Sequence, residues 1–287
     1  MESDVIHISL KSRYYPKVLK HISDPPKILY ARGNVELLNT PCLVVVGTRK
    51  ITEYGKQVVK HIVPELTRHF TIVSGLALGI DAAAHEATLD AGGMTIAVLG
   101  SGIDDITPHT NYKLGKRILD SGGLIISEYP PKFQARPGTF PVRNRIVSGI
   151  SKGVLIVEAD LKSGSLITGR LAAEQGRDVF AVPGSIFSKR TEGPFHLIKS
   201  GAKMVTCAED ILVEYDQLGL EKPRHRNLSL SPLETTLLDI LDQSGTMNVD
   251  AMIETSKSKP AEVIAALSIL ELKGAIREVG TGRYQKA

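Results

Sequence analysis

Short apolar runs alternate with longer amphipathic stretches along residues 41–182. The runs hold mainly Val, Ile and Leu without polar alternation, and they cover residues 42–46, 71–73, 94–99, 123–126, 153–157 and 178–182. Strands of this kind are buried on both faces, as in a parallel sheet that helices cover. Between the runs, Val58, Val59 and Ile62 recur at helical spacing, and residues 81–89 and 169–175 are rich in helix formers. The pattern predicts an α/β fold with helices on both faces of a parallel sheet.

The pattern changes in the last part of the chain. Ser231 and Pro232 form a helix start before apolar residues at helical spacing, a second helix is expected over 249–256, and Pro260 begins a third that ends at Gly274. Residues 275–285 contain two glycines and predict a small hairpin. Three helices followed by a hairpin favour a winged-helix domain.

These patterns predict the domain organisation. Residues 1–40 form a lead-in segment that is too short for a domain of its own, and residues 41–216 form the parallel-sheet domain. Residues 217–227 contain Pro223 and several basic residues but few apolar ones, so they are expected to be a linker. Residues 228–287 form the winged helix.

Composition excludes several classes of protein. The chain has 287 residues, 42% of them hydrophobic and 23% charged, and no apolar run approaches the ~18 residues of a membrane span. Cys42 and Cys207 are the only cysteines, too few for a disulfide framework or a four-cysteine zinc site, and residues 1–4 do not resemble a secretory signal. We expect a cytoplasmic protein.

Charge is divided unequally along the chain. The net charge of +4 is the sum of +6 over residues 1–227, with 29 Lys/Arg and 23 Asp/Glu, and −2 over residues 228–287, with 6 Lys/Arg and 8 Asp/Glu. A polyanion is therefore expected to bind the larger domain.

Glycine and serine follow most of the predicted strands. In a parallel sheet these loops meet at the carboxyl edge, where ligands bind, and glycine lets backbone N–H groups approach a phosphate. The first loop is Gly47-Thr48-Arg49-Lys50, Gly75 follows the second strand, and Ser163-Gly164-Ser165 precedes a helix that carries Arg170. A single loop of this kind often only turns the chain. Several together with basic residues, including Arg143 and Arg145 around Asn144, indicate a site for a nucleic-acid backbone.

Three aromatic residues lie near these loops, although aromatic residues make up only 5% of the chain. Tyr129, Phe140 and Phe187 could each stack on a base for ~1–3 kcal/mol, or could close the edge of the sheet.

The sequence lacks the motifs of several other classes of enzyme and of metal sites. The first loop is not Gly-x-Gly-x-x-Gly, and there is no Walker A sequence, so neither a nicotinamide enzyme nor a P-loop NTPase is expected. Asp81 and His85 lie four residues apart, but no third metal ligand is evident. Ser163 and Ser165 lack a nucleophile elbow. We expect no catalytic residue, metal or cofactor.

Several long motifs in order point to a family. They are residues 46–49 (Val-Gly-Thr-Arg), 74–85 (Ser-Gly-Leu-Ala-Leu-Gly-Ile-Asp-Ala-Ala-Ala-His), 97–102 (Ala-Val-Leu-Gly-Ser-Gly), 140–146 (Phe-Pro-Val-Arg-Asn-Arg-Ile), 163–168 (Ser-Gly-Ser-Leu-Ile-Thr) and 179–184 (Val-Phe-Ala-Val-Pro-Gly). From about Asp24 to Tyr215 the chain resembles the bacterial DNA-processing protein A (DprA/Smf) family.

The resemblance implies an extended Rossmann fold that binds single-stranded DNA, forms a homodimer and helps to load the RecA recombinase during natural transformation. It also implies that Arg49, Arg143, Asn144, Arg145 and the serines of residues 163–165 line the DNA site. The chain departs from the family pattern at Thr48, where serine is commoner, at Thr107, where tyrosine is usual, and at Phe195, where asparagine is typical.

The leading hypothesis is therefore a non-enzymatic recombination mediator that binds single-stranded DNA. The alternative is a nucleotide-cleaving enzyme similar to the phosphoribohydrolases, with Glu174 as its acid, although the Pro-Gly-Gly-x-Gly-Thr loop of those enzymes is missing. The predicted winged helix carries Glu262 and Glu271 on its third helix, so we expect an accessory role for it rather than duplex recognition.

Overall fold

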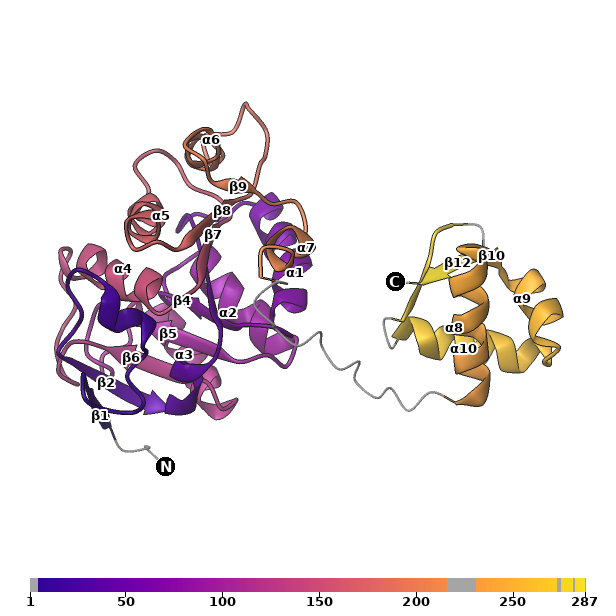
Figure 1. The fold of residues 1–287 in the computed structure, drawn as a ribbon, viewed down its shortest axis with the longest axis horizontal. Helices are drawn as coiled ribbons and strands as arrows, with labels where there is room; N and C mark the ends of the chain where they lie inside the picture. The colour runs from indigo at the N-terminus through magenta and orange to yellow at the C-terminus, as the bar shows by residue number, and fades with distance from the viewer. Residues whose placement is uncertain (1–4, 216–230, 273–274, 281, 287) are drawn as a thin grey trace. The chain divides into compact units, whose positions relative to one another are not determined.

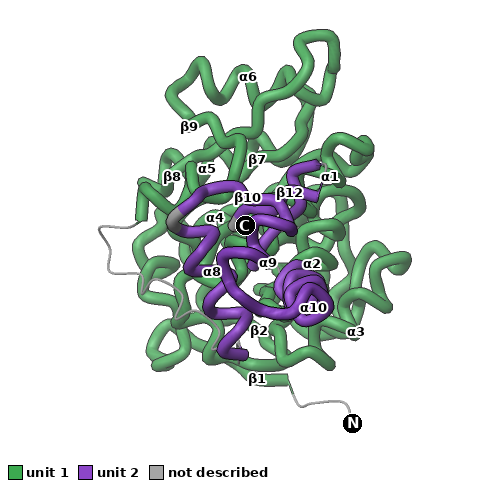
Figure 2. Tube along the Cα trace, turned by 90° about the vertical axis from the view of Figure 1, so that its right-hand side faces the viewer, with its two compact units in different colours: residues 1–222 green, residues 223–287 purple. Residues whose placement is uncertain are grey.

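The computed structural model describes residues 5–215, 231–272, 275–280 and 282–286. It divides the chain into two compact units, Met1–Lys222 and Pro223–Ala287 (Figure 2). The predicted linker 217–227 and the predicted helix end at Gly274 lie outside the described residues. Within the described part of the chain, no helix is both long and apolar enough to cross a membrane.

The first unit is built around a single sheet (Figure 1). Its strands are β1 (Ile6–Ser9), β2 (Ile28–Gly33), β3 (Cys42–Val46), β4 (Thr71–Ser74), β5 (Thr95–Val98), β6 (Leu124–Ser127), β7 (Gly153–Ile156), β8 (Asp178–Ala181) and β9 (Lys203–Met204). Its α-helices are α1 (Glu53–Leu66), α2 (Ile80–Asp90), α3 (Tyr112–Asp120), α4 (Thr139–Gly149), α5 (Gly164–Glu174), α6 (Glu192–Lys199) and α7 (Glu209–Leu212). Short 3-10 helices cover Val18–His21, Val35–Asn39 and His109–Asn111. The structure confirms all six predicted strands.

The strand order is β1-β2-β6-β5-β4-β3-β7-β8-β9. Strands β3 to β9 pair in parallel, and Val44 of β3 lies opposite both Val73 of β4 and Val154 of β7. Strands β1 and β2 are antiparallel to each other, and β2 is antiparallel to β6. The sheet is therefore mixed, and residues of the lead-in segment extend it, which the sequence pattern did not indicate.

The continuous apolar strands are explained by apolar cores on both faces of the sheet, as β3 shows. Val44 and Val46 of β3 pack with Ile146 of α4 on one face of the sheet. Leu43 and Val45 point to the other face, where they pack with side chains of α1 and α2. Because neighbouring strand residues point to opposite faces, a strand between two helical layers must be apolar throughout.

The order of the strands also places the functional edge. From β3 the chain moves outward through β4, β5 and β6, and it then returns to add β7 on the other side of β3. In a doubly wound sheet, ligands bind where the order reverses, beyond the carboxyl ends of the strands. That point lies between the loop after β3 and the loop after β7.

The second unit contains α8 (Pro232–Ser244), β10 (Thr246–Asn248), α9 (Val249–Ser256), α10 (Pro260–Leu272), β11 (Ile276–Glu278) and β12 (Arg283–Lys286). Ser231 and Glu234 form a capping box at the start of α8. Leu237, Met252 and Leu267 lie in the unit's own apolar core. The predicted hairpin is present, with β11 and β12 antiparallel, and β10, which the sequence did not predict, pairs with β12.

Candidate nucleic-acid interface

The loop after β3 is fixed by Glu158, which follows β7. The Thr48 amide donates to the Glu158 carbonyl at 2.6 Å, and the Glu158 carboxylate accepts from the Thr52 amide at 3.0 Å and from the Thr52 hydroxyl. A side chain at Gly47 would collide with the Glu158 carbonyl and with Ile80. The sequence analysis missed Glu158. The signal available in the sequence was an acidic residue directly after an apolar run.

This rigid loop presents Arg49 and Lys50 to solvent. The Arg49 guanidinium carbon lies 5.4 Å from the centre of the Phe140 ring, at the start of α4. Among the described residues Arg49 makes no ion pair. Its guanidinium therefore retains donors for an anion, while the ring limits the positions that the side chain can occupy.

Arg143 lies on α4 but is only 5% exposed. Its guanidinium donates to the carbonyls of Gly75, at 2.8 Å, and of Val98. A Cβ at Gly75 would collide with that guanidinium. Arg143 and Gly75, both predicted to line the DNA site, thus fasten α4 to the ends of β4 and β5 in this structure.

Asp81 lies near this buried arginine. Its carboxylate accepts from the Gly75 amide at 3.1 Å. Burial raises the pKa of Asp81, and the nearby Arg143 charge opposes that change. Burial likewise lowers the pKa of Arg143 to about 10, and Asp81 opposes this. Arg143 and Asp81 both bind Gly75, and so they support the loop after β4 from beneath.

Arg145 is also occupied by protein groups. Two of its nitrogens donate to the two carboxylate oxygens of Glu128, at 2.8 and 2.6 Å, and its Nε donates to Asp24 at 3.0 Å. Burial opposes the charge of Arg145, but Glu128 and Asp24 outweigh that effect and raise its pKa. Arg145 therefore joins α4 to the end of β6 and to residues ahead of β2, and its charge is balanced.

Asn144 connects α4 to the serine-rich loop. Its amide nitrogen donates to the Gly164 carbonyl at 3.3 Å, and its amide oxygen accepts from Arg143 Nε at 3.3 Å. Ser163 caps α5, and its hydroxyl lies 2.8 Å from that of Ser165. Gly164 is exposed, and a Cβ there would meet nothing within 4 Å. The predicted residues from Gly47 to Ser165 are thus brought together by contacts through Phe140 and α4.

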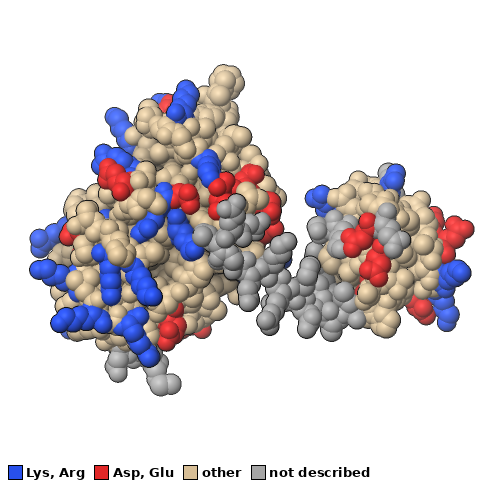
Figure 3. Space-filling view, in the orientation of Figure 1, with Lys and Arg blue, Asp and Glu red and all other residues tan. Residues whose placement is uncertain are grey.

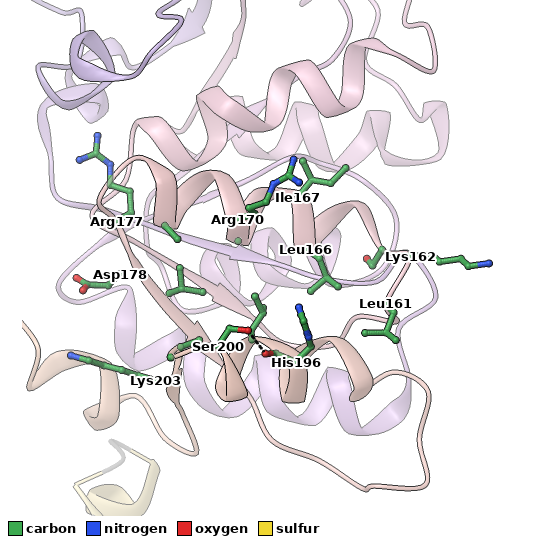
Figure 4. Close-up of a pocket in the computed structure, with 17 residues that line it drawn as sticks. Leu161, Lys162, Leu166, Ile167, Arg170, Arg177, Asp178, His196, Ser200 and Lys203 are labelled. Atoms are coloured by element: carbon green, nitrogen blue, oxygen red, sulfur yellow. Dashed lines mark hydrogen bonds between the residues drawn. The ribbon is translucent and has the colours of Figure 1, made fainter.

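Arg170 is placed apart from this group. It lies two turns along α5, is largely exposed, and its Nε lies 3.5 Å from a Glu174 carboxylate oxygen. It lines a pocket of about 760 Å³ between α5, α6 and β8–β9, whose apolar wall includes Leu161, Leu166 and Leu197 (Figure 4). In Figure 4, Lys162 and Lys203 lie at opposite ends of this pocket.

Glu174 is the acid of the enzymatic alternative. Glu174 is at the carboxyl end of α5, ten residues from Gly164, so it lies about 15 Å along the helix from the strand ends. His85 is fully buried, its Nδ1 is 2.7 Å from the Thr95 hydroxyl, and burial lowers its pKa to about 3. Among the described residues no three His, Cys, Asp or Glu side chains are grouped as a metal site would require.

The three aromatic residues have different environments. Phe140 packs against Gly100 and beneath Arg49. Tyr129 stacks on Phe133 with ring centres 4.5 Å apart, so it closes its own loop. Phe187, between β8 and α6, is 92% exposed.

Basic side chains are spread widely over the first unit. Figure 3 shows Lys and Arg across its visible face, interrupted by smaller groups of Asp and Glu. A polyanion would therefore be attracted by this whole face rather than by one patch.

Similarity to known proteins identifies the family of this chain. A family model described as DNA recombination-mediator protein A matches residues 6–216, and one described as DprA winged helix domain matches residues 221–281. DNA processing protein DprA of Bacillus subtilis is 45% identical over 77% of this chain and 74% of its own length. Protein Smf of Escherichia coli is 41% identical over 96% of this chain and 76% of its own length.

Two solved structures are similar. DNA processing protein A of Streptococcus pneumoniae superposes with a TM-score of 0.70 and 45% identity, covering 74% of each chain. DNA processing protein A of Helicobacter pylori, described by its unique single-stranded DNA binding mode, has a TM-score of 0.66 and 34% identity over 76% of this chain and 99% of its own. Because the family models match both compact units and the relatives align over most of their length, this chain belongs to the DNA recombination-mediator protein A (DprA) family.

Proposed function

We propose that the first unit binds single-stranded DNA at the carboxyl edge of its sheet. The observation that carries the proposal is Arg49, an exposed guanidinium without an ion pair among the described residues, held over Phe140 at the point where the strand order reverses. The Helicobacter pylori relative, described by its single-stranded DNA binding mode, supports it.

The DNA contacts in this proposal fall into two groups. Arg49 and Lys50 contact phosphates directly, together with the partly exposed Gly47, the exposed Gly164 and the Asn144 amide. Thr48 and Ser165 are buried and support these loops. Arg143, Arg145 and Gly75 act indirectly, because their hydrogen bonds hold α4 in place. Arg170 lies outside this group and adds only to the general positive field.

The biological role that we propose is that of a non-enzymatic mediator in the cytoplasm, which holds single-stranded DNA during natural transformation and helps to load RecA. The family name supports mediation of recombination. The position of Glu174, away from the strand ends, is the structural argument against nucleotide cleavage.

We also propose that the chain forms a homodimer through the β9 edge. β9 is the last strand of the sheet, Met204 on it is exposed, and the apolar wall of the pocket between α5 and α6 lies beside it. An unpaired edge next to apolar surface favours association. Light scattering, which measures the molar mass in solution, tests this. We expect the wild type to be a dimer and Met204→Arg to be a monomer.

A competition experiment tests the function. A labelled oligothymidine is bound to the protein, and unlabelled single-stranded DNA or duplex of equal length is added. We expect the single strand to displace the label at lower concentration, because the loops need flexible backbone and accessible bases. Stronger competition by duplex would reject the proposal. In parallel, nucleoside monophosphates should release no free base, and catalytic release would establish the enzymatic alternative.

A further inference from the structure

The loop between β8 and α6 carries the most exposed apolar side chains in the described part of the chain. Ile186 is 78% exposed and Phe187 92% exposed. The loop projects from the first unit beside α6 (Figure 1), and none of the functions proposed above uses it. An adjacent aliphatic and aromatic pair with almost no protein contact is costly in water unless it has a partner.

The base of this loop is held firmly. Pro183 O accepts from the Tyr54 hydroxyl at 2.6 Å, and the Thr191 hydroxyl donates to Ser185 O and to Ser188 O. On the other side, the Arg190 carbonyl accepts from the Ala159 amide at 2.7 Å. The exposed pair is therefore mounted on a fixed turn, so little backbone order has to be gained when it binds.

The same contacts place the loop beside the proposed DNA site. Tyr54 is on the first turn of α1, directly after the loop that carries Arg49 and Lys50. β8 is two strands from β3, and strands are ~4.8 Å apart, so the two loops leave the sheet edge ~10 Å from each other. One or two nucleotides of extended single strand can cover that distance.

The charge of the β8–α6 loop and the small area of its exposed side chains indicate what Ile186 and Phe187 contact. Residues 183–191 contain Lys189 and Arg190 and no acidic residue; Lys189 is exposed, and Arg190 pairs with Asp160 at 3.2 Å. A stable protein interface buries roughly 1,200–2,000 Å², far more than two side chains supply, whereas one exposed ring is enough to stack on a base. A basic, aromatic tip thus fits a nucleobase flanked by phosphates.

We propose that Phe187, supported by Ile186, is a base-stacking contact that extends the DNA site from Arg49 across β7 to the β8–α6 loop. The inference rests on the proposed single-strand binding. It adds a contact that needs bases, whereas Arg49 needs only phosphates, so the two can be separated experimentally.

The chain contains no tryptophan, which makes a direct reporter available. Phe187→Trp introduces a single indole at the tip, and Met94→Trp introduces one before β5, at the opposite edge of the sheet. We expect oligothymidine to quench the fluorescence of the first variant and to leave that of the second unchanged. A phosphate backbone without bases should not quench either one.

Affinity provides the second measurement. Phe187→Ala should weaken binding of a 20-residue oligothymidine about 5- to 100-fold, and Phe187→Tyr should retain it, while Met94→Ala serves as the matched control. For an abasic oligonucleotide of equal length, the wild type and Phe187→Ala should bind alike. The inference is overturned if Phe187→Ala binds oligothymidine like the wild type while Arg49→Ala does not. If the wild type binds no single strand, the proposed function itself has failed.

Discussion

Arg49 differs from Arg143 and Arg145 because it is exposed, and it differs from Arg170 because it makes no ion pair among the described residues. We expect Arg49→Ala to weaken single-strand binding about tenfold for every base sequence, since a charged hydrogen bond to phosphate is worth ~1.5 kcal/mol and carries no base information. Fluorescence anisotropy with several oligonucleotides measures this. Arg68→Ala is the control, because Arg68 is an exposed arginine just before β4, at the opposite edge of the sheet. Equal effects of the two variants would contradict the assigned site.

Arg145 is expected to matter for stability more than for direct binding. Arg145→Ala leaves the Glu128 carboxylate half-buried without its bidentate partner, which should lower the free energy of unfolding by roughly 2 kcal/mol. Urea unfolding of Arg145→Ala, Glu128→Gln and the double variant measures the coupling. If the two single changes add without coupling, the ion pair contributes little.

His85 makes stability depend on pH. Burial keeps the folded-state pKa near 3, whereas an unfolded histidine titrates near ~6.5. As the pH falls from about 6.5 toward 3, the unfolded chain gains a proton that the folded chain excludes. The histidine therefore destabilises the fold by up to ~1.4 kcal/mol per pH unit in that window. The unfolding free energy of His85→Leu should fall less steeply with decreasing pH. Parallel pH profiles would contradict this.

At the scale of elements, the strands were predictable because burial on both faces makes them continuously apolar. β1 and β2 were not predicted. Ile6–Ser9 has a single buried side chain, and Ile28–Gly33 is only partly buried, so neither shows the continuous apolar pattern of the central strands. Their pairing depends on β6, more than 90 residues later, which no local pattern can indicate.

Helix α4 contains predicted site residues whose side chains bind protein groups. Residues 140–146 hold proline, arginine and asparagine, and their basic character suggested free phosphate ligands. In the structure they form a helix whose arginines turn inward to carbonyls and carboxylates. The sequence grouped these residues, but it could not show which arginines are held by protein groups, because that depends on Glu128 and Asp24, which are distant in sequence.

The two compact units allow an element-level prediction. The first unit contains the whole proposed DNA site, and α10 of the second carries Glu262 and Glu271 without a described basic residue. We expect a chain ending at Arg226 to keep single-strand affinity within about threefold of the full length, because the phosphate contacts remain. Residues 228–287 alone should not shift duplex DNA in a gel at physiological salt. A clear shift would show that the negative net charge of this domain does not predict whether it binds DNA.

At the scale of the whole molecule, the proposed binding combines a diffuse positive field with a few rigid contacts. Residues 1–227 carry a net charge of +6, and Figure 3 shows Lys and Arg of the first unit distributed over its visible face, so a polyanion should be attracted to this unit. Selection of single strands has to come from the fixed loops at the end of the sheet. The long-range attraction should therefore depend on the salt concentration, and the local contacts should depend on whether the DNA is single-stranded or duplex.

The salt dependence of oligothymidine binding tests the central claim most directly. The logarithm of the association constant should fall linearly with the logarithm of salt concentration, with a slope of ~0.7 per phosphate contact, and Arg49→Ala should reduce the slope by about that amount. Duplex of the same length should bind more weakly at every salt concentration. Binding that is independent of salt, or stronger for duplex throughout, would contradict a phosphate-contacting single-strand site at this edge of the sheet.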